Sequence, residues 1–165
     1  MTDDSLQELQ EFHWMMDMLQ TVDVGIVVLS RDFTVKVWNG FMESHSGLLP
    51  SDVRDKSIFD LFPSIERKWF EQKAHPVFEL KTRAFMTWEQ RPYLLQFPNY
   101  RPITGSEQYM YQNITLSPLV SATGTVDNIS MMIYDVTDIA LGKKQLEALQ
   151  VLRSEEQERY AKRAQ

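Results

Sequence analysis

The sequence predicts a small α+β domain with a helix at each end, and three features lead to this prediction. An amphipathic run opens the chain, β-branched segments lie on both sides of a series of short helical stretches, and a second helical run closes the chain. The chain has 165 residues, of which 43% are hydrophobic and 24% are charged, which is enough for one ordinary core. We therefore expect one domain with helical extensions.

The first predicted element is a helix that starts at Ser5 and continues to about Gln20. The tetrapeptide SLQE from Ser5 matches a capping box, in which a hydroxyl and a glutamate satisfy the free backbone N–H groups of a helix start. Apolar residues such as Leu6, Leu9 and Met16 then recur at helical spacing. Two interpretations stay open, because this helix can cover its own core or form the seam of a dimer.

Two strands and several short helices are expected next. The run at 24–29 is β-branched and apolar, and after a tight turn the residues at 34–38 alternate. Glycines and prolines then divide 39–63 into pieces that suit helices of one or two turns. A longer helix is predicted over 64–80, and Pro76 should end it early.

The second half of the chain predicts three strands and a final helix. Strands are expected at 84–88, 109–119 and 128–134, and the last two should form a hairpin. The stretch between Trp88 and Tyr109 lacks periodicity, so we expect an elaborated loop that extends the strands on each side. Thr137 or Asp138 is expected to cap the final helix, whose apolar side chains are Ile139, Leu146, Leu149 and Leu152.

Composition excludes several classes of function. The absence of cysteine excludes disulfides, thiolate metal sites and a thiol nucleophile. The net charge of −6 argues against a nucleic-acid partner, and no apolar run approaches the roughly 18 residues of a membrane span. Residues 1–23 carry six acidic and no basic side chains, while residues 143–165 carry six basic and four acidic ones. We expect a cytoplasmic, soluble segment.

No catalytic or metal-binding pattern is present in the sequence. The six glycines form neither a dinucleotide-binding motif nor a phosphate-binding loop, and the three histidines lie far apart. We therefore expect no catalytic residues and no resident metal. Nine Phe, four Trp, six Tyr and nine Met can line an apolar ligand pocket, or they can simply fill the core.

Three segments together carry a resemblance to a known family. VDVGIVVLSRDFTVKVWN at 22–39, SDVRDKSIFDLFP at 51–63 and MMIYDVTDI at 131–139 resemble the opening hairpin, the short helices and the last strand of PAS domains. The segment 91–119 is similar to an elaborated version found in PAS modules that are fused to bacterial GGDEF diguanylate cyclases. The resemblance implies a five-stranded antiparallel sheet with short helices on one face, enclosing a small pocket.

The resemblance also implies boundaries and roles. It divides the chain into an N-terminal helix at 1–20, a sensor domain at 21–137 and a signalling helix at 138–165. The helix should relay a signal from a small ligand to a C-terminal effector, either a diguanylate cyclase or a kinase, in a protein of which this chain is one segment. A parallel homodimer should form through the terminal helices. The alternatives are a ligand-free interaction module and a haem sensor.

Candidate site residues follow from this implied fold. The implied pocket residues are Val37, Phe41, Ile58, Phe62, Trp69, Phe85, Tyr111, Asn113 and Ile133, and the signalling residues are Asp135 and Thr137. Strand alternation puts Tyr111, Asn113 and Thr115 on one face, and the sequence does not decide which face is inward.

Cofactors are constrained by single residues. A haem would need His75, although a solvent-facing histidine at a helix end is the simpler interpretation. Flavin photochemistry through a cysteinyl adduct is excluded because the chain has no cysteine. Arg91 and Arg101, each before a proline, could bind an anionic ligand or form surface ion pairs.

Overall fold

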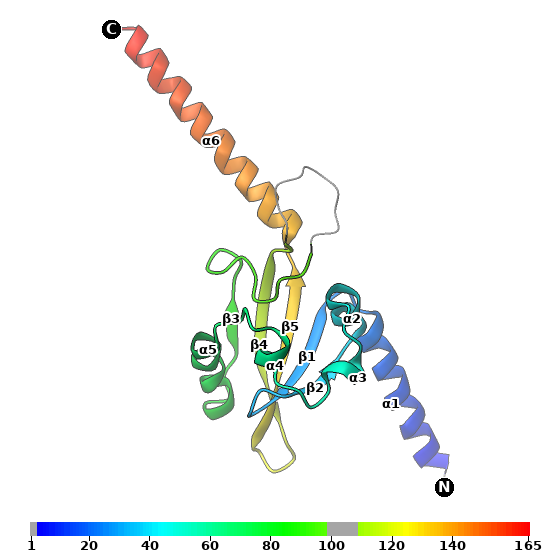
Figure 1. Cartoon of the computed structure of the whole chain (residues 1–165). Helices are drawn as coiled ribbons and strands as arrows, with labels where there is room; N and C mark the ends of the chain where they lie inside the picture. Colours follow the sequence, from blue (N-terminus) through cyan, green and yellow to red (C-terminus); the bar gives the residue numbers. More distant parts are fainter. Residues whose placement is uncertain (1–2, 99–108) are drawn as a thin grey trace. The chain divides into compact units, whose positions relative to one another are not determined.

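The computed structural model describes residues 3–98 and 109–165, and Figure 1 shows the arrangement of their helices and strands. Eleven elements are described in this part of the chain. In chain order they are α1 (Asp3–Thr21), β1 (Gly25–Ser30), β2 (Val35–Trp38), α2 (Gly40–Ser46), α3 (Pro50–Val53), α4 (Ile58–Leu61), α5 (Arg67–Glu79), β3 (Ala84–Met86), β4 (Gln112–Val120), β5 (Val126–Asp135) and α6 (Thr137–Arg163). This is the order predicted from the sequence: a helix, two strands, a series of short helices, three strands and a final helix.

The five strands form one antiparallel sheet in the order β2-β1-β5-β4-β3. Strand β5 lies in the centre, where it pairs with β1 from the start of the domain and with β4 from its second half. The hairpin between β4 and β5 is the one expected from the sequence. The sheet therefore joins the two halves of the chain through its central strand.

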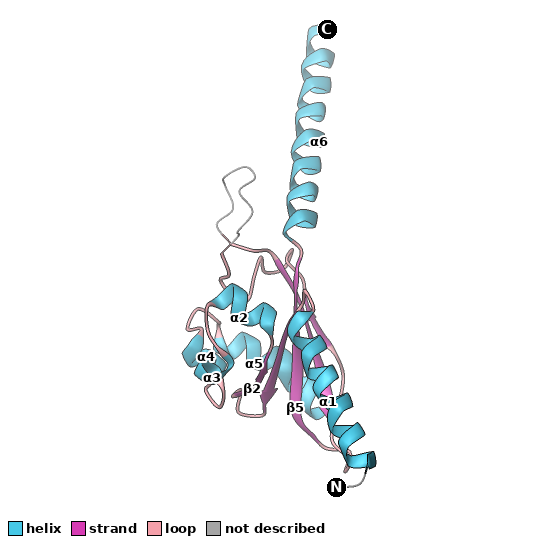
Figure 2. Ribbon diagram, turned by 90° about the vertical axis from the view of Figure 1, so that its right-hand side faces the viewer, coloured by secondary structure: helices cyan, strands magenta, loops and turns pink. Residues whose placement is uncertain are grey.

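Helices α2 to α5 cover one face of this sheet, which Figure 2 shows from the side. Helix α2 packs on β1, α3 packs on β2, and α5 packs on β3, β4 and β5. The core lies between this helical layer and the sheet. Four phenylalanines meet there, and the ring centroids of the contacting pairs are 5.4 to 6.0 Å apart. They are Phe33 between β1 and β2, Phe59 of α4, and Phe70 and Phe78 of α5. The fold class expected from the sequence is confirmed.

Local capping signals explain where two of the short helices begin. Asn39 precedes α2 and its side-chain oxygen accepts a hydrogen bond from the backbone N–H of Met42. Ser57 precedes α4 and accepts in the same way from the N–H of Phe59. Asparagine and serine are both residue types that favour the N-cap position. Gly47 ends α2 with a φ of 74°, a left-handed conformation that glycine adopts without steric cost.

Three boundary predictions are wrong. Helix α1 already includes Asp3, so Ser5 lies inside the helix. Helix α5 continues through Pro76 for three more residues, because the burial of Val77 and Phe78 outweighs one lost backbone hydrogen bond. The residue that caps α6 is Val136, which offers no side-chain acceptor, so neither Thr137 nor Asp138 caps the helix.

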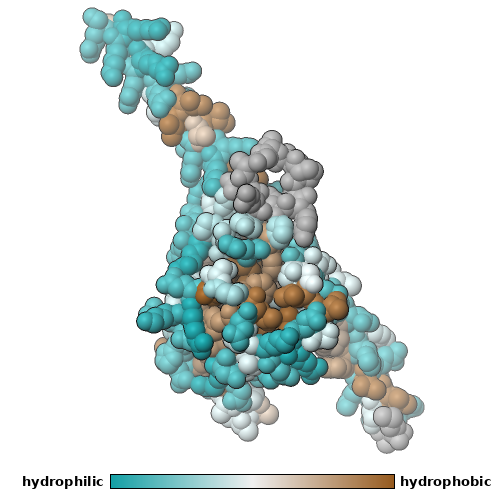
Figure 3. Space-filling view, in the orientation of Figure 1, coloured by the Kyte–Doolittle hydropathy of each residue, from teal (hydrophilic) through white to brown (hydrophobic). Residues whose placement is uncertain are grey.

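The chain divides into two compact units, Met1–Asp135 and Val136–Gln165. Within the first unit, α1 packs against α2 but buries none of its own side chains. Within the second unit, most of α6 is exposed. Figure 3 shows apolar side chains on the surfaces of both helices. They include Leu6, Leu9, Phe12, Trp14, Met15 and Met18 on α1, and Ile139, Leu146, Leu149, Val151 and Leu152 on α6.

Candidate functional site

The space between the sheet and its helices is the position at which the sequence predicts a pocket. The register of the sheet decides which residues face this space. Met131 of β5 lies opposite Val27 on one side and Leu116 on the other, and all three are fully buried. Residues of β4 that share the parity of Leu116 therefore point inward. These inward residues are Gln112, Ile114 and Leu116.

Five of the nine predicted pocket residues lie in or against this core. Phe41 of α2, Ile58 of α4 and Ile133 of β5 are buried within it. Phe62 and Trp69 are half-buried and pack on its edge. Phe62 stacks on Trp38, with ring centroids 6.1 Å apart. The structure therefore brings these five residues together around one interior volume.

The other predicted pocket residues do not face this volume. Phe85 lies opposite Thr115 on the outer face of the sheet and is 58% exposed, so the prediction that it lines an interior pocket is wrong. Asn113 is also on the outer face, where its side chain accepts from the N–H of Trp88. Tyr111 has the same parity and packs edge-on against Trp88 at 5.6 Å. The polar selectors expected from alternate positions thus belong to the outer side.

Val37 is displaced by an irregularity between β1 and β2. Val27 pairs with Trp38, whereas Leu29 pairs with Val35, so β2 contains one extra residue. This bulge turns Val35 and Trp38 inward together, and both are buried. Val37 instead pairs with Val28 on the opposite face and is half-buried.

The interior volume is filled by a segment that has no helical or strand periodicity. Leu94, Leu95 and Phe97 of the segment 92–97 are buried in the core. The backbone of this segment pairs with the start of β4, because Gln112 donates its N–H to Pro92 and Met110 donates to Phe97, both at 2.9 Å. Among the described residues, the loop does not extend β3 or β4 as strand and forms only an isolated bridge between Pro98 and Tyr109. Its burial was not predicted.

Gln112 is the polar group that holds this segment. Its side chain is 1% exposed, and its Oε1 accepts from the N–H groups of Leu94 and Leu95, each at 3.1 Å. Its Nε2 donates to the carbonyl of Leu95 at 2.8 Å. One side chain thus satisfies three buried backbone groups. Sequence reasoning missed Gln112, although its spacing from Met110, Ile114 and Leu116 places it on their face.

Replacing this amide should destabilise the domain. Gln112→Met keeps the side-chain volume but leaves the buried N–H groups of Leu94 and Leu95 without their acceptor, at a cost of roughly 1 to 3 kcal/mol for each group that water does not reach. The Leu95 carbonyl keeps a second donor, the N–H of Phe97. We expect the free energy of unfolding to fall by about 3 kcal/mol in urea titrations. Gln96→Met, at an exposed position of the same segment, is the control and should change stability by less than about 0.5 kcal/mol. Equal stability of both variants would contradict this role.

His45 lies at the edge of the same interior volume. Its ring is half-buried, 4.2 Å from the ring of Phe41 and 6.0 Å from that of Phe97. Burial lowers the pKa of His45, and the carboxylates of Asp135 and Asp23 offset part of that effect. The sequence could not place His45 here, because Phe97, Asp23 and Asp135 are distant from it in sequence.

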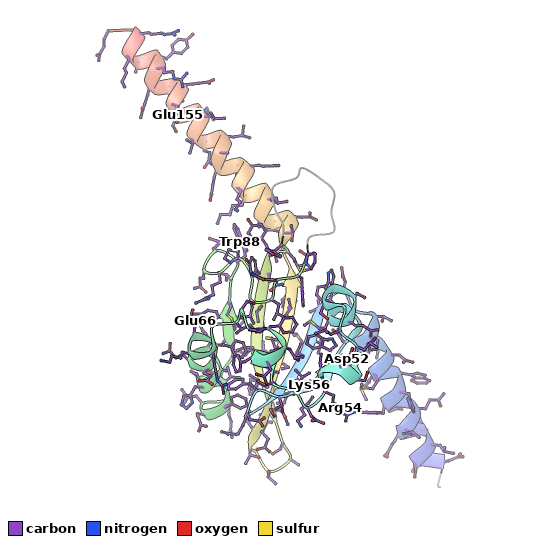
Figure 4. All side chains as sticks on the ribbon, viewed as in Figure 1. Asp52, Arg54, Lys56, Glu66, Trp88 and Glu155 are labelled. Carbon is purple, nitrogen blue, oxygen red and sulfur yellow. The ribbon has the colours of Figure 1, made fainter. Side chains whose placement is uncertain are left out.

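Arg91 forms an ion pair in the structure. Its Nη2 lies 2.6 Å from Oε2 of Glu66, and its guanidinium carbon lies 3.9 Å from the centroid of the Trp69 ring. Figure 4 labels Glu66 at the start of α5 and Trp88 beyond β3. A groove of about 300 Å³ borders this pair and is lined mainly by residues 64–66 and 91–94. Arg101 lies outside the described residues.

The remaining candidate residues are His75, Asp135 and Thr137. His75 is exposed on α5 beside Lys68, Glu71 and Gln72, and it does not face the interior. Within the described residues, no group of three or more His, Asp or Glu side chains is arranged to hold a metal ion. No helix in the same part of the chain is long and apolar enough to cross a membrane. Asp135 is exposed at the end of β5, and Thr137 is buried at the start of α6.

A family model of the PAS fold matches residues 19–140 of this sequence. The chain belongs to the PAS family. PAS domains are sensory modules, generally non-catalytic, that are typical of signal-transduction proteins such as histidine kinases. They commonly dimerise and attach to effector domains. No curated protein is significantly similar to the chain.

Solved structures share this fold. A sensory box sensor histidine kinase from Vibrio cholerae is 24% identical, with a TM-score of 0.56 over 81% of this chain and 98% of that one. The PAS domain of BvgS from Bordetella pertussis is 16% identical, with a TM-score of 0.57 over 86% and 97% of the two chains. Histidine kinase ThkA, in complex with the response regulator TrrA, is 25% identical with a TM-score of 0.60; the match covers 83% of this PAS chain but 36% of ThkA.

Proposed function

We propose that this PAS domain is a dimeric regulatory module that binds a small ligand and relays its presence through α6 to an effector domain. The observation that carries the proposal is α6 itself. This helix of 27 residues is separated from the central strand β5 by one residue, and its large apolar side chains are exposed. A helix with an exposed apolar stripe needs a partner surface to be stable in water.

The spacing of the stripe on α6 fits a second copy of the same helix. Ile139, Leu146 and Leu149 are separated by seven and three residues, which is the pattern of a two-stranded coiled coil. They are 67%, 57% and 63% exposed. Polar and charged residues take the equivalent positions after Leu152, so this seam is short. A parallel pair of α6 helices would carry a change at the end of β5 directly into an attached domain.

Helix α1 supplies a second self-association surface in this proposal. Its exposed apolar residues include Leu9, Phe12 and Met15, and within the domain it packs mainly against α2. Two acidic α1 helices would repel each other at low salt, so dimerisation through α1 should strengthen when moderate salt screens their charges. Together, α1 and α6 support a homodimer built from both ends of the chain.

The effector in this proposal is a histidine kinase or a diguanylate cyclase. Support for the kinase comes from the similarity to PAS domains of histidine kinases, one of which is in complex with a response regulator. Support for the cyclase comes from the sequence of 91–119, which resembles PAS modules attached to GGDEF domains. Both assignments give α6 the same task of transmitting a conformational change.

A second candidate function is a ligand-free interaction module. The observation that favours it is the filled interior, in which Leu95, Phe97 and Met110 are fully buried. A ligand between sheet and helices must therefore displace part of the segment 92–97. Native mass spectrometry of the purified chain separates the two functions, since a co-purified small molecule supports the ligand sensor and its absence favours the interaction module.

Charge on the seam of α6 should break the dimer. We expect Leu146→Glu with Leu149→Glu to raise the dimer dissociation constant at least tenfold in sedimentation equilibrium, because two facing pairs of carboxylates would be placed in an apolar seam. Val151→Glu is the matched control, since Val151 is 57% exposed but lies off this seam. A monomer in all three proteins, or a dimer that tolerates the double substitution, would contradict the proposed role of α6.

A further inference from the structure

We propose that His45 is a proton-sensing residue whose protonation loosens the 92–97 segment from the interior of the domain. The inference rests on the proposed regulatory function and assigns it one input, a fall in pH. It starts from the geometry of the imidazole, which lies between Phe41 of its own helix α2 and Phe97 of the segment. His45 thus joins the helical layer to the chain that fills the core.

The two ring contacts of His45 differ in strength. The contact with Phe41 is close, at 4.2 Å, and the two residues are four positions apart on one helix. The contact with Phe97 is nearly parallel but spans 6.0 Å, the outer limit at which an aromatic face attracts a cation. A charged imidazolium can therefore keep Phe41 as its neighbour, but it gains little from Phe97.

Two carboxylates act on His45 when its ring is charged. The carboxylates that act on it among the described residues are Asp135, at the end of β5, and Asp23, in the connection before β1. The segment itself contributes Leu94, Leu95, Gln96 and Phe97 near this volume, none of which titrates. Glu43 of α2 lies two residues earlier, roughly 200° around the helix axis. Protonation therefore strengthens the attraction of the ring to Asp135 and Asp23, whereas the segment 92–97 contains no carboxylate that would hold it.

The other contacts of the segment are buried side chains and backbone hydrogen bonds, and they limit how far it can loosen when this contact weakens. Its backbone is held by Gln112 and by the pairing of Pro92 and Phe97 with the start of β4. Phe97 also meets Phe62, with ring centroids 6.2 Å apart. Since Asp135 is the last residue before the unit that contains α6, a change in its electrostatic partner acts at the covalent start of the signalling helix.

The test is amide hydrogen exchange on the full 165-residue chain at pH 7.5 and pH 5.5, with rates corrected for intrinsic pH dependence. The reporters are the N–H groups of Leu95, bonded to Gln112, and of Met110, bonded to Phe97. We expect their protection to fall at least fivefold at the lower pH, while Val27 and Met131 in the centre of the sheet change by less than twofold. His45→Gln should abolish this pH effect, and His75→Gln, at an exposed position, should retain it.

The outcomes separate this inference from the proposed function. Loss of protection at Leu95 and Met110 that persists in His45→Gln would overturn the proton switch, as would unchanged protection at both pH values. Neither result depends on dimerisation through α6, so the seam experiment can succeed while this one fails. If His45→Gln unfolds the domain, His45→Asn provides a second neutral variant, and a pH effect that persists in it would also overturn the inference.

A thermodynamic measurement on the same variants provides an independent check. The pKa of His45 is lowered in the folded state by burial, so the unfolded chain binds a proton that the folded domain resists. This contribution to stability is complete above the usual histidine pKa of about 6.5 and is lost as the pH falls below it. Urea titrations should show a steeper loss of stability below pH 6.5 in the wild type than in His45→Gln, and equal slopes would contradict the assignment.

Discussion

Asn39→Ala is expected to destabilise the domain by about 3 kcal/mol or more. The Asn39 side chain is fully buried, and its Oδ1 accepts from the backbone N–H of Ile26 at 3.0 Å and of Met42 at 3.4 Å. Its Nδ2 donates to the carbonyls of Leu19 at 2.9 Å and Val24 at 2.8 Å. Alanine removes all four bonds, and each buried group left unsatisfied costs roughly 1 to 3 kcal/mol.

The measurement is thermal unfolding by circular dichroism, together with urea titration. For a chain of this length, a loss of 3 kcal/mol corresponds to a melting temperature lowered by roughly 6 to 12 °C. Asn128→Ala is the control, because Asn128 is a half-buried residue of β5 on the outer face of the sheet. It should lower the melting temperature by no more than a few degrees. A similar effect of the two substitutions would show that the Asn39 network contributes little beyond ordinary packing.

The role of Asn39 shows how far the sequence alone could lead. An asparagine before a short helix predicts a cap, and the bond from Met42 confirms it. The bonds to Leu19, Val24 and Ile26 join the end of α1 and the start of β1 to the same amide. Local pattern could not predict them, because they depend on how three separate elements are placed in space.

The sequence pattern predicted which segments form the strands, but it assigned some residues to the wrong face of the sheet. The runs that became β1, β4 and β5 are long and apolar enough to be found from sequence. Val37 was misassigned because a bulge in β2 adds one residue to the strand and reverses the alternation beyond it. Phe85 was misassigned because β3 has only three residues, too few for a periodic signal.

The burial of the segment 92–97 could not be predicted from its own residues. Its prolines and aromatic residues are typical of an exposed loop, whereas Leu95 and Phe97 are among the most buried residues of the chain. What places them inside is the amide of Gln112, which binds the backbone of the segment and not its side chains. Backbone recognition of this kind leaves little trace in the sequence of the recognised segment.

Gly40→Ala is expected to separate the end of α1 from the domain. A Cβ at position 40, the first residue of α2, would lie 2.3 Å from the backbone carbonyl oxygen of Gln20. A backbone atom cannot move aside as a flexible side chain can, so the last turn of α1 must shift or unwind. We expect a loss of about 1 to 3 kcal/mol in stability, the usual cost of forcing extra volume into a packed contact.

Gly142→Ala is the matched control, because this glycine also lies in a helix and nothing would contact its added Cβ within 4 Å. Alanine at that position should stabilise α6 by up to about 1 kcal/mol through its higher helix propensity. Limited proteolysis reports the local effect, since an α1 that is released from α2 should be cleaved near Thr21 faster in Gly40→Ala than in either the wild type or Gly142→Ala. Unchanged cleavage with unchanged stability would show that α1 follows the displaced backbone without losing its contact with α2.

Because α1 buries none of its own side chains, the Gly40 contact and the Asn39 amide are the described features that fix its C-terminal turn to α2. If α1 transmits or receives a signal in the dimer, this turn is therefore where the signal must enter the domain.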